Sequence, residues 1–286
     1  MPLDTSMIGE QTRTFEHHVD ARWLMAYAAG LGDMNPRYMD TSAGTVVGHP
    51  VFPVCLEWPV ILSSREAKGY ETTTPEEAAR GVHAAHDLHL FKPIRAGEKY
   101  RTVLTIVGLD AIRPGAAQTS KIETFDAAGE LVCRTWQLGI SRGVAVTGGD
   151  ENSETPPVLP DLGQLASSTE SLEIPVAAGL GNVYTETARI FNPIHSDKAF
   201  ALAAGLPDII LHGTATLALA ISRLVDRFAG GDPTRVTRLG GRFTGMVLMP
   251  STLTLVITGT GDGIVGFEVK NPGGETAFGQ GFLCYS

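Results

Sequence analysis

Apolar residues recur along the chain with two different spacings, one typical of helices and one typical of strands. Near the N-terminus, Trp23, Tyr27 and Leu31 follow one another at every fourth position, which places them on one face of a helix. Asp20 stands where a helix cap is expected, and the glycines around Leu31 end the pattern. The spacing therefore predicts an amphipathic helix that begins just after Asp20.

The clearest helical pattern lies in the second half, from Thr214 to Phe228. Its apolar stripe is Leu217, Ile221, Leu224 and Phe228. The residues left to face water are Arg223, Asp226 and Arg227. Gly230 and Gly231, which follow one residue beyond this stretch, predict the end of the helix.

Strand-like runs rich in Thr, Val, Ile and aromatic residues follow each helical region, joined by turns that contain glycine. They are Arg101–Val107, Lys121–Phe125, Leu131–Ser141, Leu253–Gly259, Val265–Val269 and Thr276–Cys284, with hairpin turns at 126–130 and 271–275. A sheet with a single apolar face must bury that face against another element, and each half offers one helix that can pack there. We therefore expect an α+β fold in which antiparallel sheets wrap helices.

The two halves carry similar signals in the same order. Asn-Pro pairs lie at Asn35 and Asn192, Phe-led segments at Phe91 and Phe243, and hairpin glycines at Gly129 and Gly274. The offsets are 192 − 35 = 157, 243 − 91 = 152 and 274 − 129 = 145. Between the halves, residues 147–171 are rich in Pro, Gly, Ser and acidic residues and predict a linker. We expect one repeat over 1–146 and a second over 172–286.

Composition excludes several classes of protein. The net charge of -9 and the absence of a Lys/Arg cluster argue against a nucleic-acid partner. Three widely spaced cysteines form neither a disulfide framework nor a metal-ligand pattern, and the histidines have no ligand-like spacing, so no metal is expected. No export signal and no membrane span are apparent. We expect a cytoplasmic protein that does not act on a membrane and has no cofactor.

The segment around His195 is the best candidate for chemistry. The Asn192-Pro193 pair makes a rigid loop on which His195 can exchange protons near neutral pH. Downstream, Gly213 opens the long predicted helix, so its backbone N–H has no side chain in front of it. Such a donor suits a thioester oxygen that becomes negative as an enolate forms.

These residues carry a family resemblance. Asn192-Pro193-Ile194-His195, with His212-Gly213 downstream, resembles the Gly-Asp-x-Asn-Pro-aliphatic-His motif of the MaoC-like dehydratases, or R-specific (type 2) enoyl-CoA hydratases. The first half repeats part of the motif from Gly32 to Tyr38. The resemblance implies a double hot-dog fold and a hydro-lyase of fatty-acid metabolism that acts on a 2-enoyl-CoA or (R)-3-hydroxyacyl-CoA. Coenzyme A then belongs to the substrate, and a homodimer is plausible.

Neither copy of the motif is complete. Ile190 stands where the motif has its Asp, and Tyr38 stands where it has its His, so the first copy keeps Asp33 and the second keeps His195. In one hypothesis Asp33 and His195 share a composite catalytic site, with Gly213 as oxyanion donor. In the other, His195 works with a different carboxylate such as Asp197, or the site has lost hydration.

Less specific interpretations stand beside these. His212, Asn35 and Asn192 complete the expected oxyanion and substrate-binding group, but Asn before Pro also shapes turns, and His212 can simply pack at a helix start. Asp33 equally suits a turn, while Asp40 and Asp197 suit helix starts. His195 equally suits an ordinary surface position. The competing functions are an acyl-CoA thioesterase, a non-catalytic acyl-CoA-binding protein and a subunit that completes another hot-dog protein's site.

Overall fold

The computed structural model describes residues 2–70, 74, 77 and 80–286 of the chain. Its contacts divide the chain into two compact units, each built from segments that are not contiguous in sequence. Unit 1 consists of Met1–His17, Leu56–His89 and Lys99–Leu159, and unit 2 of His18–Cys55, Leu90–Glu98 and Pro160–Ser286. Strand β2 (Phe15–Val19) spans one of the limits between them.

Unit 1 is built on an antiparallel sheet in the order β3-β6-β5-β4. Its strands are β3 (Gly81–Leu90), β4 (Glu98–Ile112), β5 (Gly115–Asp126) and β6 (Leu131–Arg142). The three strand runs predicted in the first half fall within β4, β5 and β6 and are confirmed. The predicted turn is confirmed too, since the Asp126 N–H donates to the Glu130 carbonyl over 2.9 Å. The short strands β1 (Leu3–Asp4) and β7 (Val146–Thr147) form a separate two-stranded parallel sheet, and β8 (Glu151–Asn152) pairs with β4.

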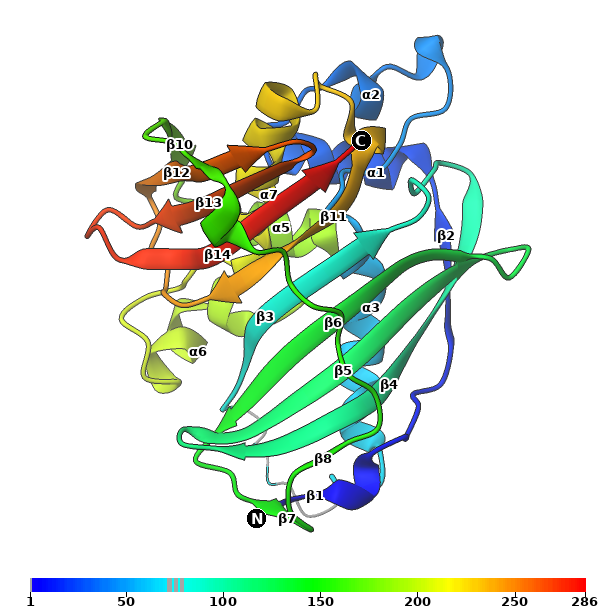
Figure 1. Cartoon of the computed structure of the whole chain (residues 1–286), viewed down its shortest axis with the longest axis vertical. Coiled ribbons are helices and arrows are strands. Elements are labelled where there is room, and N and C mark those ends of the chain that lie inside the picture. The colour runs from blue at the N-terminus through cyan, green and yellow to red at the C-terminus, as the bar shows by residue number, and fades with distance from the viewer. Residues whose placement is uncertain (1, 71–73, 75–76, 78–79) are drawn as a thin grey trace. The chain divides into compact units, whose positions relative to one another are not determined.

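Helix α3 (Pro53–Ser63) runs along one face of this sheet (Figure 1). Val60 of the helix packs into an apolar cluster with Leu104, Ile106 and Ile122 of the sheet. The periodicity did not predict α3, because Pro53 and Pro59 break the helical signal. Proline is tolerated in the first turn of a helix, but an interior proline removes a backbone hydrogen bond. Packing against the sheet therefore outweighs the local preference here.

Unit 2 contains a second antiparallel sheet, in the order β10-β12-β13-β14-β11. Its strands are β10 (Ser171–Val176), β11 (Val236–Phe243), β12 (Ser251–Gly261), β13 (Ile264–Lys270) and β14 (Thr276–Tyr285), with the short β9 (Ala166–Ser167) paired to β12. The three strand runs predicted in the second half are confirmed. Helix α7 (Gly213–Phe228) packs against β13 and β14 (Figure 1).

The helices of unit 2 explain how its loops are placed. They are α1 (Ala21–Gly30), α2 (Pro36–Met39), α5 (Leu180–Ala188), α6 (Lys198–Ala203) and α7. The predicted cap of α1 is confirmed, since Asp20 accepts a hydrogen bond from the Trp23 N–H over 2.8 Å. The predicted helix over 214–228 is confirmed as α7, with Arg223, Asp226 and Arg227 exposed.

Helices α1 and α5 lie against each other and carry equivalent tyrosines. The hydroxyls of Tyr27 and Tyr184 are 3.1 Å apart and fully buried, and the two residues are separated by the same 157 positions as Asn35 and Asn192. The two Asn-Pro loops, which follow these helices, therefore both belong to unit 2. The predicted boundaries of the repeats stay a prediction, although the chain does pass from unit 1 to unit 2 within 147–171.

Arg189, directly after α5, has a left-handed backbone with φ 57°. The equivalent position after α1 is Gly32, with φ 71°, and only glycine adopts this conformation without strain. The guanidinium of Arg189 lies 3.6 Å from the centroid of the Trp23 ring. We conclude that this cation–π contact offsets strain on the order of 1 kcal/mol.

This balance predicts different outcomes for two substitutions of Arg189. Arg189→Ala keeps the strain and loses the contact with Trp23, so we expect the free energy of unfolding to fall by about 1 kcal/mol. Arg189→Gly loses the same contact but relieves the strain, so it should stay within about 0.5 kcal/mol of the parent. Urea unfolding of both variants measures the difference. Equal losses would show that the backbone at this position is not strained.

Candidate active site

The loop after α5 holds His195 on a short helical turn. The turn, η5 (Pro193–His195), begins at Asn192, whose side chain accepts a hydrogen bond from the Ile194 N–H over 3.4 Å. Asn192 therefore shapes the loop. His195 is half-buried, so the loop holds its ring in place while part of the ring stays accessible to a substrate.

The hydrogen bond of His195 fixes which ring nitrogen carries a proton. Nδ1 lies 2.8 Å from the Ile210 carbonyl, and because a carbonyl only accepts, Nδ1 must be the protonated nitrogen. Nε2 is then a bare lone pair in the neutral ring. Burial lowers the pKa of His195 to about 4, against the smaller opposite effect of the Ile210 carbonyl. His195 is thus neutral at pH 7, and its Nε2 has a lone pair that can accept a proton.

A second histidine lies against this ring. The His212 ring is stacked on His195 with 3.7 Å between centroids and 28° between planes. Nε2 of His212 lies 3.3 Å from Thr185 Oγ1 and 3.4 Å from the Ile190 carbonyl. Burial, and then the neighbouring His195, lowers the pKa of His212 to about 2. His212 is only 2% exposed and lies behind His195, so its predicted part in binding substrate stays a prediction.

Gly213 begins α7 directly after His212, as predicted. A Cβ atom at this position would lie 2.7 Å from Phe243 Cδ1, so the close approach of the aromatic ring requires glycine. Among the residues that the structure describes, no acceptor pairs with the Gly213 N–H. A free N–H at the positive end of a sixteen-residue helix is a suitable donor for a developing oxyanion.

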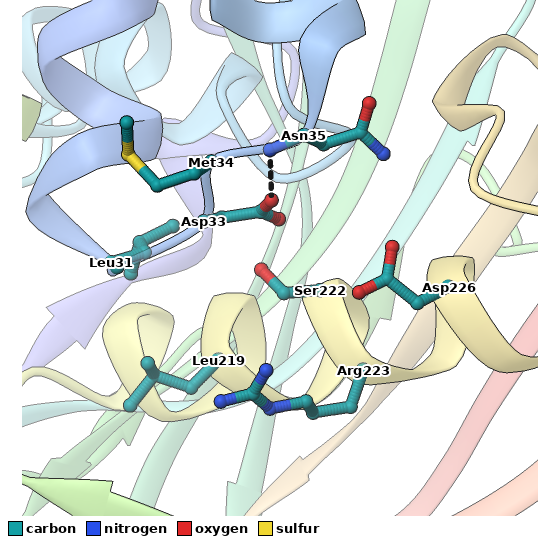
Figure 2. A pocket seen from close by; sticks show the side chains of 9 residues that line it. Leu31, Asp33, Met34, Asn35, Leu219, Ser222, Arg223 and Asp226 are labelled. Atoms are coloured by element: carbon teal, nitrogen blue, oxygen red, sulfur yellow. Dashed lines mark hydrogen bonds between the residues drawn. The ribbon is translucent and has the colours of Figure 1, made fainter.

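Asp33 lies in a different part of unit 2, in a pocket of about 220 Å³ between the end of α1 and the side of α7 (Figure 2). Asp33 accepts a hydrogen bond from the Asn35 N–H over 3.1 Å, and Ser222 and Asp226 of α7 face it across the pocket. Burial, and then the charge of Asp33, raises the pKa of Asp226. Asn35 caps α2 by accepting from the Arg37 N–H over 2.9 Å, so it shapes this loop as Asn192 shapes the other.

His49 is a neighbour of this pocket that the sequence did not single out. It is 1% exposed, and its Nε2 lies 3.1 Å from Ser222 Oγ. Nδ1 accepts from the Val51 N–H over 3.1 Å, so the neutral ring carries its proton on Nε2 and donates to Ser222. The ring therefore cannot take a proton from Ser222, which argues against a serine nucleophile here. The repeat in the sequence could have identified His49, because it follows the first Asn-Pro loop as His212 follows the second.

The described contacts do not bring Asp33 and His195 together. Ser222, which faces Asp33, lies nine residues after Gly213 on α7, or about 13 Å along the helix axis. Burial and the Ile210 carbonyl account for the shifted pKa of His195, and no described carboxylate contributes. The other carboxylate considered, Asp197, caps α6 by accepting from the Phe200 N–H over 3.0 Å. The composite site therefore stays a prediction without support from these contacts.

The remaining histidines do not form a metal site. Within residues 2–70, 74, 77 and 80–286, no group of three or more His, Cys, Asp or Glu side chains is arranged to hold a metal ion. His83 and His86 both lie on β3, with their ring centroids 5.3 Å apart. In the same described part, no helix is long and apolar enough to span a bilayer.

Comparison with known proteins identifies both halves of the chain. Residues 171–275 match the MaoC like domain, and residues 6–135 match the FAS1-like dehydratase domain region. The chain is 27% identical over 282 residues to 3-hydroxyacyl-thioester dehydratase Y of Mycobacterium tuberculosis, with 97% of this chain and 94% of that protein covered. It is 29% identical over 187 residues to the peroxisomal enoyl-CoA hydratase 2 of Arabidopsis thaliana, covering 60% of this chain and 58% of that protein.

Solved structures show the fold. The MaoC-like dehydratase from Phytophthora capsici has a TM-score of 0.81 at 19% identity, covering 98% of this chain and 96% of that chain. A Mycobacterium tuberculosis protein described as a double hot-dog has a TM-score of 0.62 at 13% identity, covering 97% and 95%. The predicted α+β double hot-dog fold is confirmed.

Proposed function

We propose that the chain adds water to a 2-enoyl-CoA, or removes it from a 3-hydroxyacyl-CoA, at His195, because residues 171–275 match the MaoC like domain and residues 6–135 match the FAS1-like dehydratase domain region. The observation that supports this most is that one site offers two groups. They are the bare Nε2 of His195 and the N–H of Gly213, which has no acceptor among the described residues. One group accepts a proton and the other stabilises negative oxygen, which are the two tasks of the reaction.

The chemistry balances with these groups alone. Water donates a proton to Nε2 of His195 while its oxygen bonds to C3 of the enoyl chain. The π electrons of the double bond move toward the thioester, whose carbonyl oxygen becomes negative and accepts a hydrogen bond from Gly213. The protonated His195 then gives its proton to C2, so that the product has gained one water. Dehydration is the same sequence in reverse.

The test is the loss of absorbance of the conjugated thioester when purified protein meets crotonyl-CoA or longer and dicarboxylic enoyl-CoAs. We expect hydration without release of thiol. Release of free CoA, followed with a thiol reagent, would instead identify a thioesterase. Unchanged spectra across the whole panel would defeat the proposal.

Asp33 distinguishes this site from the composite one. If His195 works without Asp33, then Asp33→Asn should keep turnover within a few-fold of the parent. A composite site predicts a loss of roughly two orders of magnitude, because a general base would be lost. Asp226→Asn, which removes the facing carboxylate of the same pocket, is the matched control for changes in charge. Steady-state hydration rates of the two variants decide between the two arrangements.

We place the enzyme in the cytoplasm, acting on a small-molecule thioester. The charge of -9 is consistent with a partner other than nucleic acid. We further propose that coenzyme A is held as part of the substrate and that no cofactor is needed, since the proton transfers above use only protein groups.

A further inference from the structure

The stacked pair of histidines has features that hydration by His195 alone does not explain. The 3.7 Å between the centroids of His195 and His212 is shorter than the 4.9 Å between His212 and Tyr184, its neighbour on α5. The two rings differ in exposure, since His195 is half-buried and His212 is 2% exposed. Substrate can therefore reach His195, while His212 acts only through it.

His212 is held neutral and in one orientation. The Ile190 carbonyl accepts a hydrogen bond from Nε2, so Nε2 carries the proton and Nδ1 is bare. Nδ1 is buried, and no partner for it exists in the described part of the chain. An unpaired buried polar atom costs about 1–3 kcal/mol, which an apolar side chain of similar size would avoid. Packing alone therefore does not account for a histidine at this position.

Apart from His212, few groups lie near the positive charge that His195 carries once it has taken a proton. When His195 takes a proton from water, the imidazolium lies in a partly buried loop whose described neighbours include no carboxylate that affects it. Asp197, the nearest in sequence, is engaged as the cap of α6. The Ile210 carbonyl contacts Nδ1, and the face of His212 covers the ring. A cation over an aromatic face gains about 0.5–2 kcal/mol.

We propose that His212 is the positioning residue of this reaction: its neutral stacked ring fixes the plane of His195 and stabilises the charge that His195 carries after taking a proton. The inference rests on the proposed hydration at His195. It assigns to an aromatic face the role that a carboxylate often has beside a catalytic histidine. His212 therefore acts on turnover and has no contact with the thioester.

Two substitutions separate stacking from simple filling of space. His212→Phe keeps an aromatic face, so we expect kcat within about threefold of the parent. His212→Leu fills similar space without a face, so we expect kcat to fall by roughly 2- to 30-fold. KM should stay within about twofold in both, because His212 does not contact substrate. Melting temperatures are measured to confirm that each variant is folded.

His49→Leu is the matched control, because His49 is an equally buried histidine whose ring lies 5.8 Å from Tyr27 and 5.6 Å from Tyr38. Its loss should leave kcat unchanged. Nitrogen-15 NMR of His195 at neutral pH adds a readout without substrate: one Nδ1–H tautomer is expected in the parent and His212→Phe, and a mixture in His212→Leu.

The inference is overturned if His212→Leu keeps full kcat, or if His212→Phe loses as much as His212→Leu while both are folded. Failure of the proposed function has a different signature, since the parent protein would then hydrate no thioester while the NMR experiment still reports the orientation of His195.

Discussion

We expect replacement of His195 by glutamine to lower the rate of hydration by roughly two orders of magnitude or more. The reason is that Nε2 of His195 is the bare nitrogen at the site, because Nδ1 donates to the Ile210 carbonyl. Glutamine retains a polar side chain but neither accepts the proton of water nor returns it to carbon. Stopped assays with crotonyl-CoA at saturating concentration measure the loss in kcat.

The exposed His18 provides the control for this result. His18→Gln makes the same chemical change away from the loop and should retain full activity. The pH dependence gives a second check, since burial lowers the pKa of His195 to about 4. The base form then persists down to that pH, so kcat/KM should stay level from pH 8 to 5 while the protein is folded. A His195→Gln enzyme with full activity would contradict the assignment.

Acidification from pH 7 to 5 should destabilise the folded protein strongly. Burial is the largest cause that lowers the pKa of five histidines, to between about 2 and about 4. They are His49, His83, His86, His195 and His212. The unfolded chain binds protons near the ordinary value of 6.5, while the folded chain does not. Stability is therefore fully present above 6.5 and is lost as pH falls.

The size of this effect is large compared with typical stability. At pH 5, a histidine with an unfolded pKa of 6.5 and a folded pKa near 4 contributes a loss of about 2 kcal/mol, or on the order of 10 kcal/mol for five. Glu57 has the opposite effect, because burial raises its pKa to about 7, so that it adds stability of about 2 kcal/mol between pH 7 and pH 5. The combined loss from the five histidines is therefore larger than the gain from Glu57. Proteins of this size are stable by about 5–15 kcal/mol.

Urea unfolding at pH 7.5, 6.5, 5.5 and 5 measures the slope. His86→Leu provides a control, because both ring nitrogens of His86 are buried without a partner in the described part of the chain. This variant should lose less stability than the parent between pH 7 and 5. A midpoint that does not change down to pH 5 would show that these histidines are protonated in the folded state.

The helices and strands follow from local sequence far better than the site does. The cap at Asp20, the stripe on α7 and the two hairpin turns depend on neighbouring residues, so the chain itself predicts them. Helix α3 is the exception, because its stability depends on packing against a sheet that forms from distant residues. Pro53 and Pro59 also interrupt the helical pattern, so the local sequence does not predict a helix here.

The site depends on which distant side chains meet, and periodicity carries no such information. The motif placed Asp33 and His195 in equivalent loops, and a shared site was a reasonable hypothesis. In the structure, Ser222 and Asp226 face Asp33, and His212 is stacked on His195, so the shared site stays a prediction. Only tertiary contacts decide between these arrangements.

The two loops thus have different chemistry despite their shared Asn-Pro turn. The loop of His195 lies beside the N-terminus of α7, and the N–H of its first residue has no acceptor among the described residues. The equivalent position after His49 is Pro50, which has no N–H, and the following Val51 N–H already donates to His49. Among the residues that the structure describes, an oxyanion donor is therefore available beside His195 and not beside His49, which supports the proposal that the thioester binds at the second loop.

A crystal structure of the protein with a bound 3-hydroxyacyl-CoA tests this account most directly. The account predicts the 3-hydroxyl oxygen within hydrogen-bonding distance of His195 Nε2, with the thioester oxygen accepting from the Gly213 N–H. A 3-hydroxyl bound by Asp33, with the thioester away from Gly213, would contradict it.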